Sequence, residues 1–375
     1  MGNITDDIRA HLDDFASRSF SDVDSLALAQ LAYARMPDNV PRWSDTAAAS
    51  AQPIATVSVR DLLRAECYDA MFGRVWSPAL NIDLLRAMAE SPRWRSLRVG
   101  EYVSELEPET TKQFSACVFD LGDGRLYVAF RGTDSSIIGW KEDFAMAFRR
   151  PVASQEAAAR YLTNIAARWA GPIMIGGHSK GGNLAVYAAA SVPQAVQQRI
   201  VGVYSHDGPG FDSAFFATPG YARIANVISK SVPEASIIGM LFERREDAAD
   251  GYAVVNSTGV GIMQHFALNW QVQDGHFQLA QGLTASARYA ARTLNDWMDR
   301  YDDEHRRLFI ESLFHILEAG GYSTFGELTA HWTQSLPAML AASRDIDPAD
   351  REVAAAVLKG LVSTAAASVI PDGRG

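Results

Sequence analysis

Short apolar runs alternate with longer amphipathic stretches through the middle of this 375-residue chain. The runs have the length of β-strands, and the stretches between them have the spacing of apolar positions typical of helices. Strands are expected at Leu97–Ser104, Phe114–Leu121, Arg125–Phe130, Ile173–Ile175, Ile200–Ser205, Arg223–Ile228 and Tyr252–Asn256. Such an alternation predicts an α/β fold with a mainly parallel central sheet and helices on both faces.

Turn and helix signals extend this picture to both ends of the chain. Gly122-Asp123-Gly124 separates two of the strands and predicts a hairpin. Helices are expected within Phe20–Tyr33 and at Val57–Met71, Pro78–Ala89, Ser154–Trp169, Leu184–Ala190, Ala285–Trp297, Glu304–Leu317 and Pro348–Thr364. We therefore expect a core over residues 1–280, with a possible lid near 208–245, and a helical extension over 281–375 that packs on this core.

One turn carries candidate chemistry. Gly177-His178-Ser179-Lys180-Gly181 joins an apolar strand to a helix and has the G-x-S-x-G pattern. In this setting the serine occupies a strained turn and its hydroxyl projects above the sheet edge, while larger side chains at the glycine positions would collide with neighbouring elements. The alternative is a glycine-rich turn with Ser179 as a helix cap. Glycines on both sides of the serine favour a nucleophile.

A serine nucleophile needs a histidine base, which an acid must orient. His265 follows the strand Tyr252–Asn256 and a loop that contains glycines, so it lies where the last core strand ends and is the expected base. His276 is the reserve candidate. Three later histidines fall on predicted helices and are expected to be surface or packing residues: His305, His315 and His331.

The acid has three candidates. Asp207 comes directly after the strand Ile200–Ser205 and His206, and a Gly-Pro-Gly turn follows it, which gives a carboxylate a rigid place at the carboxyl end of a strand. Asp212 and Glu234 are its rivals. A turn-forming role is the alternative for Asp207 itself.

An oxyanion intermediate needs two fixed hydrogen-bond donors. The backbone N–H of Lys180, directly after the serine, is one candidate. The backbone N–H of Thr133, aided by its hydroxyl, is the other, because the loop that carries it leaves the carboxyl end of the strand Arg125–Phe130. His178 is expected to be structural.

Composition narrows the classes of function. The formal net charge of −10 argues against nucleic acid and anionic membrane surfaces as partners. No apolar run reaches the ~18 residues that span a bilayer, and the N-terminus has no basic and apolar segments of a secretion signal. Cys67 and Cys117 lie in apolar contexts and are expected to be reduced, so a cytoplasmic location is the expectation. No cluster with metal-ligand spacing occurs, and neither a metal nor another cofactor is expected.

The motifs together resemble a known group of proteins. Phe130-Arg131-Gly132-Thr133-Asp134, the later Trp140 and Asp143, and the segment 177–183 resemble the class three lipases, which are α/β-hydrolases. The chain is more similar still to a bacterial lipase-like family of unknown function, on the segments 207–211, 232–241, 264–265 and 270–272.

This resemblance implies roles for individual residues. It implies Ser179 as nucleophile, His265 as base and Thr133 as oxyanion donor. Class three lipases place the acid just before a Val-Pro pair, but here Lys230-Ser231 precedes Val232-Pro233, so the acid has moved and Asp207 is the natural substitute.

The resulting hypothesis is a serine esterase that acts on a small-molecule or lipid ester through an acyl-enzyme. Apolar side chains between the later strands are expected to bind the acyl group, with core packing as their alternative: Phe211, Phe215, Phe216, Ile237 and Met240. A hydrolase-like fold used only for binding is the alternative function, because a fold alone confers no activity. Acyl transfer or thioester hydrolysis by the same serine also remains open.

Overall fold

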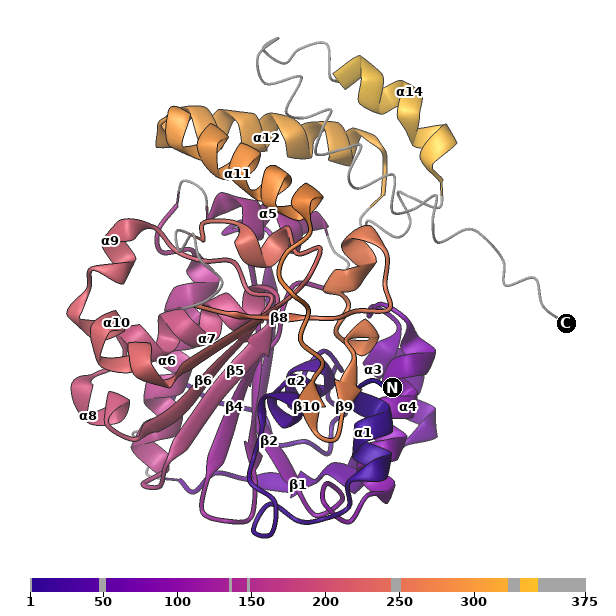
Figure 1. The fold of residues 1–375 in the computed structure, drawn as a ribbon, viewed down its shortest axis with the longest axis vertical. Coiled ribbons are helices and arrows are strands. Elements are labelled where there is room, and N and C mark those ends of the chain that lie inside the picture. The colour runs from indigo at the N-terminus through magenta and orange to yellow at the C-terminus, as the bar shows by residue number, and fades with distance from the viewer. Residues whose placement is uncertain are drawn as a thin grey trace, which may run out of the picture.

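The computed structural model describes residues 2–46, 52–134, 137–146, 149–243, 251–322 and 331–342. At its centre, eight strands form one sheet in the order β1 to β8 (Figure 1). The strands are β1 Thr56–Ser58, β2 Arg98–Glu107, β3 Lys112–Asp120, β4 Leu126–Phe130, β5 Ile173–His178, β6 Ile200–His206, β7 Ile228–Pro233 and β8 Ala253–Val255. Neighbours are antiparallel from β1 to β4 and parallel from β4 to β8. The mainly parallel sheet and the β3–β4 hairpin are thus confirmed.

Alternate residues of the strands face opposite cores, as the two-residue period of a strand requires. On β4, Tyr127 and Ala129 belong to one apolar core. Leu126, Val128 and Phe130 belong to the other. A strand buried on both faces reads as a continuous apolar run, which is why β4 and β5 were visible in the sequence.

Helices cover both faces of the sheet (Figure 1). The first core lies under α1 Ile4–Ala10, α2 Asp22–Leu31, α3 Tyr68–Phe72 and α4 Pro78–Glu90. The second lies under α6 Ala153–Arg168, α7 Lys180–Ser191, α8 Gln194–Gln197, α9 Ser213–Phe216 and α10 Pro219–Ile224. A short hairpin of β9 Val272–Gln273 and β10 His276–Phe277 stands apart from the main sheet.

The remaining helices gather above the carboxyl ends of the parallel strands (Figure 1). They are α5 Ile137–Ala145, α11 Ala285–Arg300, α12 Asp303–Ala319 and α14 Trp332–Ala342. Buried Phe309, Leu313 and Phe314 of α12 belong to a cluster against which Trp140 and Phe144 of α5 pack. The described part of the expected extension therefore packs on the core through α5, and the helix expected at 348–364 lies outside the described residues.

Three expectations about elements need correction. Residues 57–71 are not one helix, because β1 pairs with β2 and only short helical turns follow it. The strand expected at 223–228 is shifted, since α10 occupies Pro219–Ile224 and β7 begins at Ile228. Part of the possible lid at 208–245 is core sheet, because β7 pairs with both β6 and β8, and residues 244–245 lie outside the described ranges.

Two observations bear on the environment of the chain. Within the described ranges, no helix is long and apolar enough to cross a membrane. Cys67 and Cys117 are both free thiols, and Cys117 is buried in the core. Burial raises the pKa of the Cys117 thiol well above its usual range, so this residue is inert packing.

Candidate active site

Ser179 occupies the tight turn that its sequence motif predicts. It lies between β5 and α7 with φ 58° and ψ −134°, a conformation that non-glycine residues rarely adopt. A Cβ atom on Gly177 would lie 2.3 Å from the backbone carbon of Gly181, and one on Gly181 would lie 2.1 Å from the carbonyl oxygen of Phe130. Both glycines are therefore required by the close approach of α7 to the ends of β4 and β5.

His265 and Asp207 meet at the same edge of the sheet. His265 Nδ1 lies 2.5 Å from Asp207 Oδ2. Because a carboxylate only accepts hydrogen bonds, Nδ1 carries the hydrogen and Nε2 is left as the acceptor. Asp207 follows β6, and β6 pairs with β5 up to the register position of His178 and His206, so the acid lies beside the turn that holds Ser179.

Two residues that sequence reasoning missed hold the acid in place. Asp207 Oδ1 accepts hydrogen bonds from Ser236 Oγ at 2.5 Å and from the backbone N–H of Gly239 at 3.1 Å. A Cβ atom on Gly239 would lie 2.2 Å from that oxygen, so a side chain there would displace the carboxylate. Both residues follow Val232-Pro233, the pair before which class three lipases place the acid and this chain has Lys230-Ser231.

The rival acids and the reserve base lie elsewhere. Asp212 caps α9 and forms an ion pair with Arg150. Glu234 accepts a 3.4 Å hydrogen bond from Gln264, and His276 is an exposed residue of β10. The remaining late histidines are partly or fully exposed on the helical extension: His305, His315 and His331.

His178 supports the backbone of the candidate base, in line with the structural role expected for it. Its Nε2 lies 2.7 Å from the carbonyl oxygen of His265, and its Nδ1 lies 3.0 Å from the hydroxyl of Tyr33. Burial lowers the pKa of His178 well below its ordinary value, so the ring is neutral. A neutral ring donates from Nε2 to the carbonyl and accepts the Tyr33 proton at Nδ1. Tyr33, which lies nearly 150 residues earlier, had no signal in the sequence.

The loop after β4 passes directly beside the serine. A Cβ atom on Gly132 would lie 3.1 Å from Cβ of Ser179 and 2.1 Å from the hydroxyl of Tyr33. The next residue, Thr133, donates its hydroxyl hydrogen to Asp143 Oδ2 at 2.5 Å. The hydroxyl of Thr133 is therefore engaged with Asp143 of α5.

The side chain of Lys180 does not reach solvent, which the sequence did not indicate. It is 1 % exposed, and its ammonium lies 3.0 Å from Glu142 Oε2 and 3.5 Å from Asp143 Oδ1. Burial lowers the pKa of Lys180, but the carboxylates of Glu142 and Asp143 more than offset this effect and the net shift is upward. Lys180 is therefore charged inside the protein.

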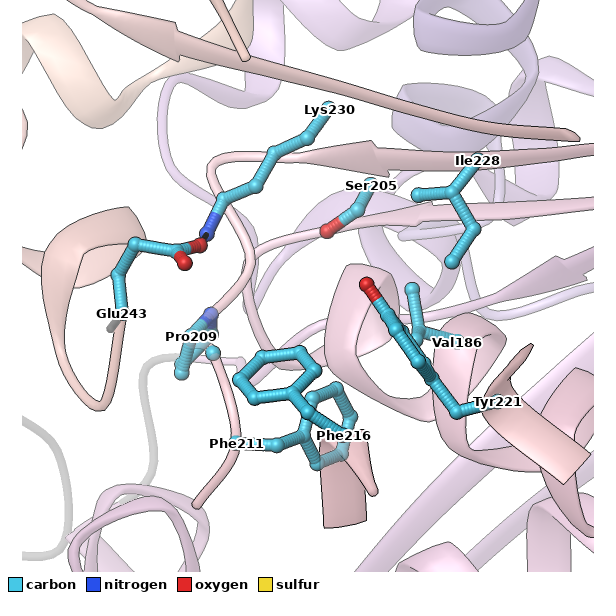
Figure 2. Close-up of a pocket in the computed structure, with 10 residues that line it drawn as sticks. Val186, Ser205, Pro209, Phe211, Phe216, Tyr221, Ile228, Lys230 and Glu243 are labelled. Carbon is cyan, nitrogen blue, oxygen red and sulfur yellow. Dashed lines mark hydrogen bonds and ion pairs between the residues drawn. The ribbon is translucent and has the colours of Figure 1, made fainter. Parts of the chain in front are cut away.

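Four of the five residues expected to bind an acyl group make packing contacts of their own. Phe211 and Phe215 stack with ring centroids 4.0 Å apart, and Tyr187 stacks on Phe215 from α7. Phe211 and Phe216 line a cavity of about 20 Å³, space for one water, whose lining does not include Ser179 (Figure 2). Met240 is buried in a separate apolar cluster.

The reason for this arrangement is that aromatic rings gain most by stacking on one another and on the core. Ile237 is the exception among the five. It is half-buried and lies between Ser236 and Gly239, the two residues that hold Asp207. Across the described residues, no group of three or more acidic, histidine or cysteine side chains is arranged to hold a metal ion.

This protein has an α/β-hydrolase fold: its sheet is mainly parallel and covered on both faces, and a strained serine turn follows β5. The chain belongs to the Mbeg1-like family, whose model matches residues 88–315. Comparison with curated proteins found no match.

The chain is similar in structure to several solved lipases, but its sequence identity to them is low. A deletion mutant of Rhizomucor miehei lipase in its propeptide complex is 17 % identical with a TM-score of 0.33, over 68 % of this chain and 94 % of that one. The M37 lipase is 14 % identical with a TM-score of 0.38, over 74 % and 80 %. Lipase II from Rhizopus niveus is 14 % identical with a TM-score of 0.33, over 54 % and 77 %.

Proposed function

We propose that this protein is a serine hydrolase that cleaves carboxylic esters, with Ser179 as nucleophile, His265 as base and Asp207 as acid. The observation that supports it best is the 2.5 Å contact between His265 Nδ1 and Asp207 Oδ2, at the sheet edge where Ser179 occupies its strained turn. Serine, acid and histidine also follow one another in the chain order of α/β-hydrolases.

In this mechanism Asp207 fixes the tautomer of His265, and Nε2 takes the proton of Ser179 as the hydroxyl attacks the ester carbonyl. The alkoxide leaves with the proton from His265, and an acyl-enzyme remains. Water, deprotonated by the same nitrogen, then releases the acid product. Asp207 is 0 % exposed and holds its two other donors throughout, so it orients the imidazole without moving.

The tetrahedral intermediate would be stabilised by two backbone donors. The N–H of Lys180 stands at the first position of α7, where the helix dipole also favours negative charge. The N–H of Thr133 belongs to the loop that passes beside Ser179. Donors of this kind contribute because they are already oriented before charge develops.

The substrate class we propose is a neutral ester with an apolar acyl group. Ile237 is the apolar residue attached to the acid-holding segment and is proposed to contact the acyl chain. No contact with the acyl chain is proposed for the aromatic cluster of Phe211, Phe215 and Phe216, because its rings pack on one another and Ser179 does not line the cavity beside them.

The test is covalent labelling combined with turnover. A fluorophosphonate probe should label Ser179, and Ser179→Ala should abolish both labelling and hydrolysis of a p-nitrophenyl ester panel of graded chain length. The variant should keep the thermal midpoint of the wild type, which shows that it is folded. A folded wild-type protein inert to probe and panel alike would favour a binding role for this fold.

A further inference from the structure

Glu142 joins four elements of the fold through one buried carboxylate. It lies on α5 and its side chain is 2 % exposed. Its Oε2 accepts from the backbone N–H of Gln113 on β3 at 2.8 Å and from Lys180 Nζ on α7 at 3.0 Å. Its Oε1 accepts from the backbone N–H of Ser154 on α6 at 3.0 Å. A change at this carboxylate therefore reaches β3, α6 and α7 as well as α5 itself.

The buried ion pair between Glu142 and Lys180 is expected to add little to the free energy of unfolding. Taking two charges out of water costs about as much as their attraction returns, so well-packed apolar residues would serve stability equally well. What an ion pair adds is a defined distance and direction between the elements that carry its two groups. Here those elements are α5 and the first residue of α7.

The backbone donors proposed for the oxyanion are attached to the same two elements, one within α7 and the other in the loop that leads to α5. Lys180 contributes its own N–H, and Thr133 stands four residues before α5 and binds Asp143 on that helix. Gly139 lets α5 approach closely, since a Cβ atom there would lie 2.7 Å from Cγ2 of Thr133. The spacing between the two donors therefore depends on how α5 is held against α7.

We propose that Lys180 and Glu142 are positioning residues, and that their buried ion pair sets the spacing of the two backbone donors in the oxyanion hole. The inference rests on the proposed ester hydrolysis. Neither side chain touches the substrate: the ammonium of Lys180 points to α5, and only its backbone faces the reacting carbonyl.

The expected signature is a loss of turnover with little change in substrate affinity. An oxyanion donor acts on the transition state and not on the bound ester, so a shifted donor lowers kcat and leaves KM unchanged. For Glu142→Gln and Lys180→Met we expect kcat to fall by about 10- to 100-fold, less than complete removal of a donor costs. Lys180→Arg, which keeps the charge, should retain more activity than Lys180→Met.

The matched control is a second buried ion pair whose carboxylate lies on β2, three strands away from β5 in the sheet. Arg168 and Glu101 are each 3 % exposed and lie 2.6 Å apart. Arg168 ends α6 just before β5 begins, whereas Ser179 follows the end of β5. Glu101→Gln therefore makes the same chemical change in an equally buried pair, away from the serine.

The experiment measures kcat, KM, the rate of fluorophosphonate labelling and the thermal midpoint for wild type, Glu142→Gln, Lys180→Met, Lys180→Arg and Glu101→Gln. The inference is supported if Glu142→Gln and Lys180→Met lower kcat and labelling, with KM within about threefold, while Glu101→Gln does not.

It is overturned if folded Glu142→Gln is as active as wild type, or if Glu101→Gln loses as much activity. Should Lys180→Met not fold, Glu142→Gln decides, because glutamine keeps the shape and an acceptor for the ammonium. A wild-type protein inert to ester and probe refutes the proposed function itself, and this inference with it.

Discussion

Asp207 is the residue whose replacement separates the proposed mechanism from its alternatives. Asparagine has the same shape but offers an N–H₂ group and one oxygen in place of two, so it no longer fixes the tautomer of His265. We expect Asp207→Asn to lower kcat by about 10⁴-fold, the order seen when a triad acid loses its charge. Steady-state hydrolysis of a p-nitrophenyl ester measures this.

The control for that substitution is Glu234→Gln. Glu234 contacts Gln264 and not the base, so its loss of charge should leave kcat within about threefold of the wild type. A larger loss in Glu234→Gln than in Asp207→Asn would move the acid to Glu234.

A second residue-scale prediction concerns acid stability. His206 lies between the hydroxyls of Ser231 and Ser25, at 2.8 Å and 2.9 Å, and burial lowers its pKa from 6.5 to about 3. The unfolded chain therefore binds this proton at a higher pH than the folded protein does. The stability that neutral His206 contributes is complete above pH 6.5 and is lost as pH falls from 6.5 towards 3.

His206→Gln removes this titration while keeping side-chain hydrogen-bonding groups. Between pH 8 and pH 5 the wild type should lose about 2 kcal/mol of unfolding free energy that His206→Gln does not lose. Urea unfolding at both pH values measures the difference. Equal losses in the two proteins would mean that His206 titrates alike in both states.

At the level of single residues, the sequence located the candidate chemistry but not its supports. Ser179, Asp207 and His265 were found because each follows a strand that an apolar run predicts, and carboxyl ends of parallel strands share an edge. Tyr33 and Glu142 were not found, because their contacts arise only when distant elements pack. Phe211, Phe215 and Phe216 were expected to bind the acyl group because they are apolar and lie near Asp207 in the sequence. The sequence pattern does not distinguish aromatic residues that line a pocket from aromatic residues that stack on one another.

At the level of elements, the sequence predicted the positions of strands and helices that bury apolar side chains, and it misplaced a strand that buries polar ones. The continuous apolar runs of β4 and β5 and the helix α4, which begins at Pro78, were placed within a few residues. β7 was misplaced because it reads Ile-Ser-Lys-Ser-Val, and the polar Lys230 is buried, with its ammonium bound to the carbonyl of Gly239 and the carboxylate of Glu243. The apolar residues before it form α10 instead, which Thr218 caps and Pro219 opens.

The contact between α5 and α12 gives a prediction of its own. Phe314 on α12 is 0 % exposed and meets Phe144 of α5 edge to face, with ring centroids 5.7 Å apart. Phe314→Ala should cost about 3–5 kcal/mol of local stability. Because α5 also carries Glu142, we expect a lower kcat together with a lower thermal midpoint.

The comparison for Phe314→Ala lies on the same helix. Leu308 is 48 % exposed, so Leu308→Ala removes a similar apolar group without opening a cavity. Calorimetry and ester turnover on both variants test the coupling. Loss of stability in Phe314→Ala with no change in kcat would show that the helical extension does not act on the site.

At the level of the whole molecule, the sheet brings together residues from widely separated parts of the chain. Tyr33, Gly132, Ser179 and His265 meet at one edge, although more than 200 residues separate the first from the last. The α/β class followed from the alternation of strands and helices, and the α/β-hydrolase fold followed from the serine motif and the resemblance to class three lipases. The closeness of the N-terminal helices to this edge did not, since it depends on how the first core fills.

The charge of the whole chain predicts how it selects among esters. A formal net charge of −10 creates a negative potential that repels anionic substrates and leaves neutral ones unaffected. Raising the ionic strength from ~0.01 M to ~0.15 M shortens the Debye length from ~30 Å to ~8 Å and screens this repulsion.

For a p-nitrophenyl ester whose acyl chain ends in a carboxylate, kcat/KM should therefore rise with salt, by a factor of about 3 to 10. The neutral ester of equal length should change by less than about twofold. Identical salt dependence for the two esters would mean that the potential near Ser179 is set by local groups, such as the buried charges of Lys180 and Glu142, and not by the net charge of the molecule.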